Sequence, residues 1–261
     1  MKSLCLAFSC TGERLTNLLR MLSEIPKING VYINIFLQNP ISEFSSNSPE
    51  YLHIYCLDNV GLSKSRNAAI VNVESDFIWF LDDDVCLTEK DVRFALNIIQ
   101  EGDADFFRIR IGCIEDKRKC YKRYNKVSKV RRVNLLQVSS IEIIADLTYI
   151  KKQALQFNEN IGLGTKYGGG EEVHFLIDAW ERGARFVFSD TTAVYHSCRE
   201  EGRTLANNEI FEIRGATASR FRSYGALLIL RWSFRYFLKY KNLTYLRALV
   251  VGYIRGYNAY K

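Results

Sequence analysis

Short apolar runs alternate with helix-like segments along the first half of this 261-residue chain. The apolar runs have the length of buried strands, and the segments between them repeat their apolar residues at helical spacing. The expected strands are residues 4–8, 32–37, 52–57 and 77–81, and the expected helices are residues 15–25, 62–71 and 91–100. This alternation predicts an α/β fold with a mostly parallel sheet, in which ligands bind beyond the carboxyl ends of the strands.

The second half of the chain is less regular. Further strands are expected at residues 105–111, 139–150, 184–188 and 192–197. A glycine-rich segment leads into a helix at residues 171–183, which Gly183 is expected to end. From about Arg214 the chain becomes helical, aromatic and basic.

The composition is that of a chain with a substantial core. Hydrophobic residues make up 48% of the sequence, and no Gly/Ser-rich linker or internal repeat interrupts it. The seven cysteines are scattered singly without a C-x-x-C pair, which favours reduced thiols in a cytosolic protein over disulfides or a zinc site. The first ten residues have too short an apolar run for a signal peptide.

The net charge of +7 is concentrated late in the sequence. Residues 202–261 contain eleven Lys/Arg and two Glu, a balance of +9, so residues 1–201 sum to −2. A local basic cluster also occupies residues 117–132. A basic tail is typical of proteins that bind nucleic acid or an anionic membrane surface.

Three consecutive aspartates, Asp82, Asp83 and Asp84, follow the apolar run FIWFL. Adjacent carboxylates repel one another unless a cation lies among them. Carboxylates at a strand end suit Mg²⁺ or Mn²⁺, ions that usually also hold the phosphates of a substrate. A solvated turn is one alternative. A haloacid-dehalogenase-type phosphatase is another, but no obvious downstream lysine and acidic pair completes its motif.

The segment DNVGLSKSRNAAI, residues 58–70, runs into the helix that precedes the aspartates. Gly61 permits a tight turn, and Lys64 and Arg66 place positive charge near the helix start, where free N–H groups favour an anion. Alone, the segment is equally compatible with an ordinary capped helix. Together with the aspartates it predicts a diphosphate site.

Two glutamates and a late histidine complete the candidate chemistry. Glu171 and Glu172 follow three glycines at a helix start, where they either complement the helix dipole or supply a general base. Two adjacent carboxylates need not ionise alike, which favours one of them as a base near neutral pH. His196 follows a short strand and is either structural or a metal ligand.

The segments NVGLSKSRN, WFLDDDV, IGLGTKYGGGEE and VYHS occur in this order and together resemble glycosyltransferase family 2 over residues 1–203. The resemblance implies the GT-A fold, a Rossmann-like and mostly parallel sheet flanked by helices. It also implies an inverting, hexosyltransferase-type enzyme that uses a nucleotide-diphosphate sugar, expected to be a UDP-sugar, with Mn²⁺ or Mg²⁺.

The same resemblance implies residue roles. Glu172 occupies the second acidic place of the family's G-E-D motif and is expected to be the base, with Glu171 as a supporting residue near the acceptor. The expected metal ligands are Asp84, Asp82 and His196. The expected donor-binding residues are Thr11, Asp58, Gly61, Lys64, Arg66, Asp82 and Asp83.

The chain departs from the family pattern at two places. After the first strand it has SCTGERL in place of a P-T-x-N-like turn. After the second strand it offers only Gln38 and Asn39 in place of acids that hold the nucleotide base. These departures leave the nucleotide open, and Asp58 is expected to supply part of the missing contact.

The basic tail, residues 204–261, is expected to form a helical, membrane-facing extension beside a catalytic domain at residues 1–203. Residues 225–239 combine an apolar face with basic residues at i, i+4 spacing, which is typical of an interfacial helix and too charged for a spanning one. The apolar face consists of Leu227, Leu230, Phe234, Phe237 and Leu238, and its flank consists of Arg231, Arg235 and Lys239.

The sequence therefore predicts a metal-dependent glycosyltransferase of the cytoplasm, peripheral on the inner face of the cell membrane, in surface polysaccharide synthesis. Its acceptor is expected to be a glycan or a polyprenyl-diphosphate-linked sugar. The cluster at residues 117–132 either contacts the diphosphate of that acceptor or is a solvated loop, and the solvated loop is the favoured interpretation. Two alternatives stay open. One is a nucleotidyl or phosphate-transfer enzyme with the same aspartates, and the other is a basic nucleic-acid-binding protein, for which no RNA-binding motif is found. The oligomeric state is left open.

Overall fold

The computed structural model describes residues 1–40, 51–162, 165, 168–199, 207–221 and 223–259. Within these residues, seven strands form one sheet in the order β3-β2-β1-β4-β6-β5-β7. The strands are β1 Leu4–Thr11, β2 Val31–Gln38, β3 Leu52–Leu57, β4 Phe77–Asp82, β5 Phe106–Cys113, β6 Ile143–Asp146 and β7 Phe186–His196. Only β6 runs antiparallel to its neighbours β4 and β5, so the described sheet is mostly parallel, as predicted.

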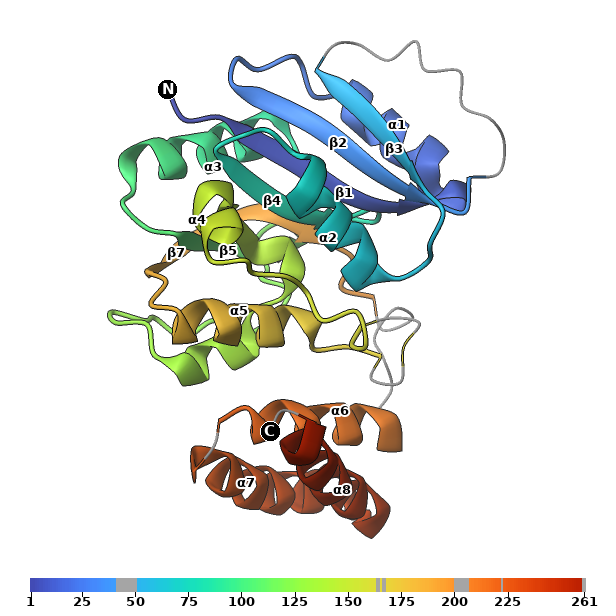
Figure 1. Ribbon diagram of the computed structural model, residues 1–261, viewed down its shortest axis with the longest axis vertical. Coiled ribbons are helices and arrows are strands. Elements are labelled where there is room, and N and C mark those ends of the chain that lie inside the picture. Colours follow the sequence, from blue (N-terminus) through green and yellow to red (C-terminus); the bar gives the residue numbers. More distant parts are fainter. Residues whose placement is uncertain (41–50, 163–164, 166–167, 200–206, 222, 260–261) are drawn as a thin grey trace.

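Helices cover both faces of the sheet (Figure 1). The helices are α1 Leu15–Ser23, α2 Leu62–Asn72, α3 Glu89–Glu101, α4 Leu147–Lys152, α5 Glu171–Glu181, α6 Asn208–Ser219, α7 Ser223–Tyr240 and α8 Leu243–Ala259. Residues of α1 and α3 share one buried apolar cluster, and residues of α2, α4 and α5 share another. The result is a three-layer α/β arrangement.

Alternation along the central strands sends side chains into both clusters. In β1, Leu4, Leu6 and Phe8 enter the cluster with α1 and α3, whereas Cys5 and Ala7 enter the opposite one. A strand that is buried on both faces must be apolar at every position, because its successive side chains point to opposite sides. This requirement explains the continuous apolar runs that made these strands recognisable in the sequence.

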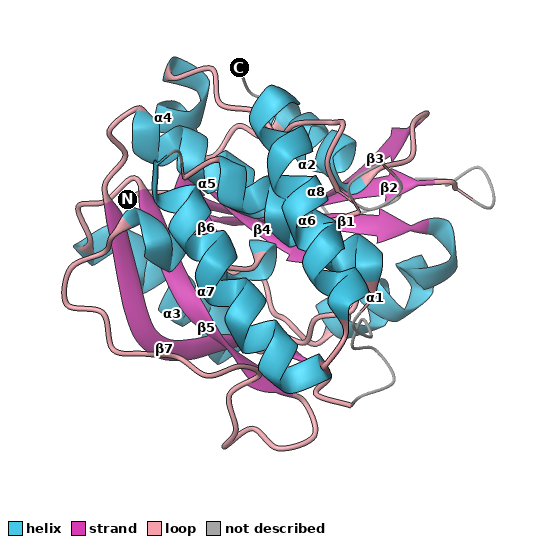
Figure 2. Ribbon diagram, turned by 90° about the horizontal axis from the view of Figure 1, so that it is seen from below, coloured by secondary structure: helices cyan, strands magenta, loops and turns pink. Residues whose placement is uncertain are grey.

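Helices α6, α7 and α8 form a separate layer below the sheet in Figure 1, and Figure 2 shows them in front of it. They have a small buried cluster of their own, which includes Phe211, Ile229 and Leu249. This layer is attached to α5 by Arg220, which pairs with Asp178, and by Phe221, which enters the core beside α5. None of the helices in the described part of the chain combines the length and apolar character that crossing a bilayer requires.

Three predicted elements differ from the structure. The strand-like stretch at residues 139–150 contains only the short strand β6, because Asp146 accepts a hydrogen bond from Tyr149 N at 2.8 Å and caps α4. The two expected strands at residues 184–188 and 192–197 are one irregular strand, β7. The helical tail begins at Asn208, earlier than predicted. The predicted domain boundary at residues 203/204 lies outside the described residues.

Candidate active site

The three aspartates lie where the carboxyl ends of β1 and β4 meet. Because β1 and β4 are parallel and adjacent, Thr11 at the end of β1 comes close to the aspartates that follow β4. Thr11 N donates a hydrogen bond to Asp83 Oδ2 at 3.0 Å. The backbone of the neighbouring strand therefore holds Asp83. The side chain of Asp83 is more buried than that of Asp84, and the two carboxyl groups form one edge of the site.

Arg14, which the sequence reasoning did not single out, supplies a cation for this edge. Its Nη1 lies 2.9 Å from Asp83 Oδ1 and 3.2 Å from Asp84 Oδ2. Arg14 belongs to the SCTGERL turn, where the chain departs from the family pattern. This departure was the available signal for Arg14, because the turn contains a charged residue that the family pattern lacks.

A second cation, Arg66, is fully enclosed. It extends from α2 and its Nη2 lies 3.0 Å from Asp82 Oδ1, while Nη1 lies 2.8 Å from Glu171 Oε1. Nη2 also donates a hydrogen bond to Ser140 Oγ at 2.7 Å, a contact that sequence reasoning did not predict. Burial disfavours the charged guanidinium, but the three carboxylates of Asp82, Glu171 and Glu172 outweigh it and raise the pKa of Arg66.

Arg66 thus joins two predicted motifs that lie about ninety residues apart in the chain. Asp82 closes β4, and Glu171 opens α5. Burial raises the pKa of Asp82, and the positive charge of Arg66 opposes this effect. Within the described residues, Arg66 Nε and Glu171 Oε2 are buried without a hydrogen-bond partner. Such orphaned polar atoms are rare in proteins, so this junction has hydrogen-bonding capacity left for water or a ligand.

Asp84 and His196 face each other as the metal prediction requires. His196 Nε2 lies 3.4 Å from Asp84 Oδ1, and both side chains are partly exposed. The hydrogen bond between them is the main reason why the pKa of Asp84 is lowered and that of His196 is raised.

The available ligands fit a Mg²⁺ or Mn²⁺ ion that is shared with a diphosphate. No group of three or more His, Cys, Asp or Glu side chains gathers in a metal-binding arrangement in the described part of the chain. One carboxylate with one imidazole nevertheless suits these ions, because they keep several positions for substrate phosphates and water. Asp82, the third predicted ligand, is directed to Arg66 instead.

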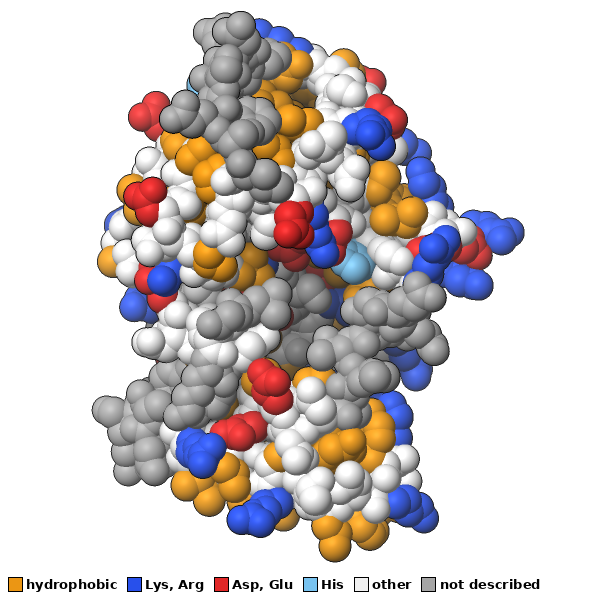
Figure 3. Space-filling model, turned by 90° about the vertical axis from the view of Figure 1, so that its right-hand side faces the viewer, with side chains coloured by type: hydrophobic (Ala, Val, Ile, Leu, Met, Phe, Trp, Pro, Cys, Tyr) orange, Lys and Arg blue, Asp and Glu red, His pale blue; other side chains and the backbone are white. Residues whose placement is uncertain are grey.

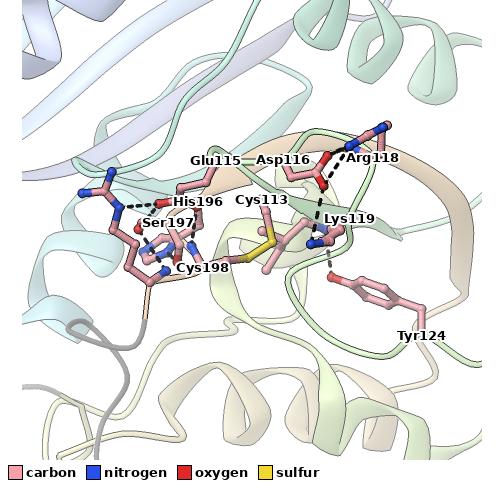
Figure 4. The surroundings of a disulfide bond; sticks show 11 residues. Cys113, Glu115, Asp116, Arg118, Lys119, Tyr124, His196, Ser197 and Cys198 are labelled. Carbon is pink, nitrogen blue, oxygen red and sulfur yellow. Dashed lines mark hydrogen bonds and ion pairs between the residues drawn. A yellow bond between two sulfur atoms is a disulfide. The ribbon is translucent and has the colours of Figure 1, made fainter.

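The segment that carries His196 is fastened to the end of β5 (Figure 4). Glu115 accepts hydrogen bonds from Ser197 Oγ at 2.5 Å and from Cys198 N at 2.8 Å. Cys198 also forms a disulfide with Cys113, the last residue of β5. The expectation of reduced thiols throughout is therefore wrong for this pair. Spacing along the chain did not reveal it, because 85 positions separate the two cysteines.

The two glutamates occupy different surroundings at the start of α5. Glu171 is buried against Arg66, whereas Glu172 is half-buried and lines a cavity of about 850 Å³. Burial, followed by the charge of Glu171, raises the pKa of Glu172 to about 8. Glu172 is thus the carboxyl group whose proton affinity lies near neutral pH, as a general base requires.

The structure brings only some of the predicted donor residues into contact. Gly61, whose φ is 139°, is the N-cap residue that precedes α2. Its N–H donates a hydrogen bond to Gln38 Oε1 at 2.6 Å. Lys64 lies in the first turn of α2 and is half-buried. Asp58 is exposed just after β3 and forms no hydrogen bond or ion pair with the other described site residues. Residues 163–164 and 166–167 of the glycine-rich segment lie outside the described residues.

Figure 3 shows a hollow between the sheet-containing part and the helical part, with acidic, basic and histidine side chains on its upper rim. Helix α6 packs close to the glycines that precede Glu171. A Cβ atom on Gly170 would lie 3.1 Å from Thr217 Oγ1. The C-terminal helices therefore form one wall of the candidate site.

Comparison with known proteins supports this interpretation of the fold. Residues 37–159 match the family model Glycosyl transferase family 2. The crystal structure of Staphylococcus aureus TarS 1-349 has 16% sequence identity and a TM-score of 0.61, and the match covers 85% of this chain and 66% of that chain. The same fragment in complex with UDP-GlcNAc has 17% identity and a TM-score of 0.59, with 85% and 67% covered. A search of curated proteins gives no match.

The mostly parallel sheet with its flanking helices is a GT-A-like fold, which confirms the predicted fold class, and the C-terminal helices are present as predicted. The family model covers just under half of the chain and agrees with the resemblance to glycosyltransferase family 2 that the motifs predicted. The chain spans just under two thirds of the TarS 1-349 chain and 39% of the longer TarS chain.

Proposed function

We propose that this enzyme transfers a sugar, with inversion, from a UDP-sugar to a hydroxyl group of a glycan acceptor in surface polysaccharide synthesis. The observation that carries the proposal is the enclosed Arg66, which joins the aspartate edge to the helix that presents Glu172. A donor site and a base are thereby held in one rigid unit. The fragment of TarS binds UDP-GlcNAc and UDP in its crystal structures, and the shared fold supports the same donor class here.

In the proposed reaction, Glu172 accepts the proton of the acceptor hydroxyl as that oxygen attacks the anomeric carbon of the donor sugar. The bond from this carbon to the diphosphate oxygen breaks, and the nucleoside diphosphate leaves with the electron pair. Glu171 pairs with Arg66, which also pairs with Asp82, and so keeps the start of α5 close to the aspartates. Lys64 and the free N–H groups at the start of α2 attract the diphosphate.

Asp84 and His196 are the residues proposed to hold Mn²⁺ or Mg²⁺. When bound, such an ion neutralises the negative charge that develops on a departing diphosphate. Arg14 occupies one oxygen of Asp84 in the structure, so its side chain must turn aside when an ion takes that oxygen.

Substitution of the two glutamates tests the proposal. Glu172→Gln keeps the shape of the side chain but cannot accept a proton, so kcat should fall roughly 10²–10⁴-fold. UDP binding should not change, because Glu172 does not contact the aspartate edge. Glu171→Gln should act chiefly on the acceptor KM. Full activity of Glu172→Gln would show that the base is another residue.

The released product separates the proposal from its nearest alternative. A glycosyltransferase releases UDP from a UDP-sugar, whereas a nucleotidyl-transfer enzyme with the same aspartates releases pyrophosphate. A screen of nucleotide sugars with Mn²⁺ or Mg²⁺ present should therefore yield nucleoside diphosphate. Release of pyrophosphate alone would establish the alternative.

We also propose that the enzyme is peripheral on the inner face of the cell membrane and acts on a lipid-linked acceptor. Supporting this, Leu227, Leu230 and Phe234 on α7 are 61%, 67% and 69% exposed. Exposed apolar patches on a basic helix are typical of membrane or protein contacts. Vesicle flotation should show binding to anionic vesicles that Leu230→Ser with Phe234→Ser weakens. Equal binding by the variant would exclude this face.

The proposed cytoplasmic location has a separate test. Disulfides persist in oxidising compartments and are rare in the cytosol, and Cys113 is paired with Cys198 in the structure. Free thiols should be counted in protein that is alkylated directly in lysed cells. Seven free thiols fit the proposed compartment, and five place the enzyme in an oxidising one.

A further inference from the structure

The cavity beside Glu172 is lined by cations that come from distant parts of the chain. It has a volume of about 850 Å³ and lies between the segment around residues 122–139 and helices α6 and α7. Its basic lining residues are Lys122, Arg123, Arg214, Arg231 and Arg235, and its only acidic lining residue among those described is Glu172. Side chains of like charge repel one another, so an anion that binds among them is stabilised by several positive charges at once.

Most of these cations have no carboxylate partner within the described residues. Lys122 is neutralised by Glu142, which is fully buried. Arg214 lies over the rings of Phe211 and Tyr236, at 5.4 Å and 5.1 Å from their centroids, and forms no ion pair there. Arg123, Arg231 and Arg235 likewise form no ion pair with a described residue. Four guanidinium groups are thus available to an anion.

Helix α7 packs an apolar face inward, where Ile229 is buried and Trp232 and Tyr236 are partly buried. Outside this face Leu230 and Phe234 are exposed, and Arg231 and Arg235, which are also exposed, line the cavity. An amphipathic helix normally turns its apolar stripe inward and its charges outward. The sequence reasoning assigned these two arginines to a membrane-facing flank, and in the structure they line the cavity.

We propose that this cavity binds a phosphate group of the acceptor and so places the acceptor hydroxyl at Glu172. This inference rests on the proposed function, because it takes Glu172 as the base. The cavity contains none of the predicted donor residues, so the anion that it accommodates is distinct from the donor diphosphate. The N–H groups of an arginine side chain match the arrangement of phosphate oxygens. Four arginines offer more N–H donors than the two oxygens of one carboxylate can accept.

Binding of inorganic pyrophosphate tests the inference without knowledge of the acceptor. Calorimetry in EDTA avoids binding through a divalent ion. The double variant Arg231→Gln with Arg235→Gln should weaken pyrophosphate binding at least about tenfold, because charge-assisted hydrogen bonds are the strong ones. Its affinity for UDP should stay the same. Arg247→Gln, on the exposed surface of α8 and outside the cavity, is the matched control and should bind pyrophosphate as wild type does.

The binding of farnesyl diphosphate distinguishes two sources of such a phosphate, a lipid-linked acceptor and a soluble glycan that carries a phosphate. Tighter binding of farnesyl diphosphate than of pyrophosphate indicates a lipid-linked acceptor, and equal binding indicates a phosphate carried by a soluble glycan. The inference is overturned if the double variant and Arg247→Gln bind pyrophosphate equally well, whether or not UDP binds. If pyrophosphate binding depends on Arg231 and Arg235 but no nucleotide sugar is cleaved, the phosphate site is supported and the proposed transferase function is wrong.

Discussion

The sheet-containing part and the C-terminal helices differ in how far their apolar and charged side chains are covered or paired within the chain. In the sheet part, helices of the same chain cover both faces of the strands, and the buried Arg66 is neutralised by Asp82 and Glu171. In α7, Leu230 and Phe234 are exposed while arginines line a cavity. The first part covers its apolar strands and pairs its buried arginine with carboxylates of its own, whereas the second leaves both an apolar face and a cationic cavity for other molecules.

The difference also separates two kinds of positive charge within one site. Arg66 is paired internally, so its first role is to hold β4 and α5 together. Arg231 has no such partner among the described residues and is available to a ligand. Removing the first should therefore affect the stability of the fold, and removing the second should affect binding.

Loss of Arg66 should have the largest effect on stability. Arg66→Met leaves the carboxylates of Asp82 and Glu171 near one another in a largely enclosed place. Removal of one partner of a buried ion pair lowers the free energy of unfolding by about 3–5 kcal/mol. Lys64→Met, on the same helix but half-buried and unpaired within the described residues, is the control and should cost far less. Urea unfolding measures both. Equal stability of the two variants would mean that Arg66 does not hold the two motifs together.

The C-terminal layer should be sensitive where its helices touch through glycine. A Cβ atom at Gly252 of α8 would lie 2.0 Å from the carbonyl oxygen of Glu212 in α6. Gly252→Ala should therefore lower the free energy of unfolding by about 1–3 kcal/mol, although alanine is intrinsically the better helix former.

Gly169→Ala is the control for this prediction, because a Cβ atom there meets nothing within 4 Å. Thermal unfolding should show a lower Tm for Gly252→Ala alone. An unchanged or higher Tm would mean that α6 and α8 are not in close contact.

The pH dependence should report Glu172. Its carboxylate must be ionised to accept a proton, and its pKa is raised to about 8 by burial and by Glu171. Below pH 8 the ionised fraction falls, so kcat/KM should drop about tenfold per pH unit and level off above pH 8. Glu171→Gln removes a negative charge and should move the midpoint to lower pH. A flat profile between pH 6 and 8 would exclude Glu172 as the base.

The smallest stability effect is expected on the outward face of α7. Leu230→Ser should change the free energy of unfolding by no more than about 0.5 kcal/mol, because the side chain is exposed. Ile229→Ala, at the next position but buried, should cost about 2–5 kcal/mol. Urea unfolding of the pair checks which face of α7 packs inward. A large decrease in the free energy of unfolding for Leu230→Ser would show that another part of the protein covers this face.

Much of the sheet part was predictable from the sequence because its rules are local. Continuous apolar runs identified the central strands, and a local capping box of Thr88 with Asp91 opens α3. The order of elements then placed the aspartates at the carboxyl end of a parallel strand. Residues 139–150 were the exception, since one buried apolar run contains both β6 and the start of α4.

The composition of the site required the tertiary structure. Motifs in the sequence identified Arg66, Asp82 and Glu171 separately, but they did not show that one guanidinium binds both carboxylates. Ser140 and the Cys113–Cys198 pair had no local signal, and the only signal for Arg14 was a departure from the family pattern, because their partners are distant in sequence and near only in space.

The direction of α7 shows the same limit. The sequence by itself determined that one side of this helix is apolar and that its flank is basic, since both follow from spacing. Which side faces the protein depends on what the neighbouring surface offers. The apolar cluster with Phe211 and Leu249 takes up Ile229, so Phe234 remains exposed and Arg231, although exposed itself, borders the cavity beside Glu172.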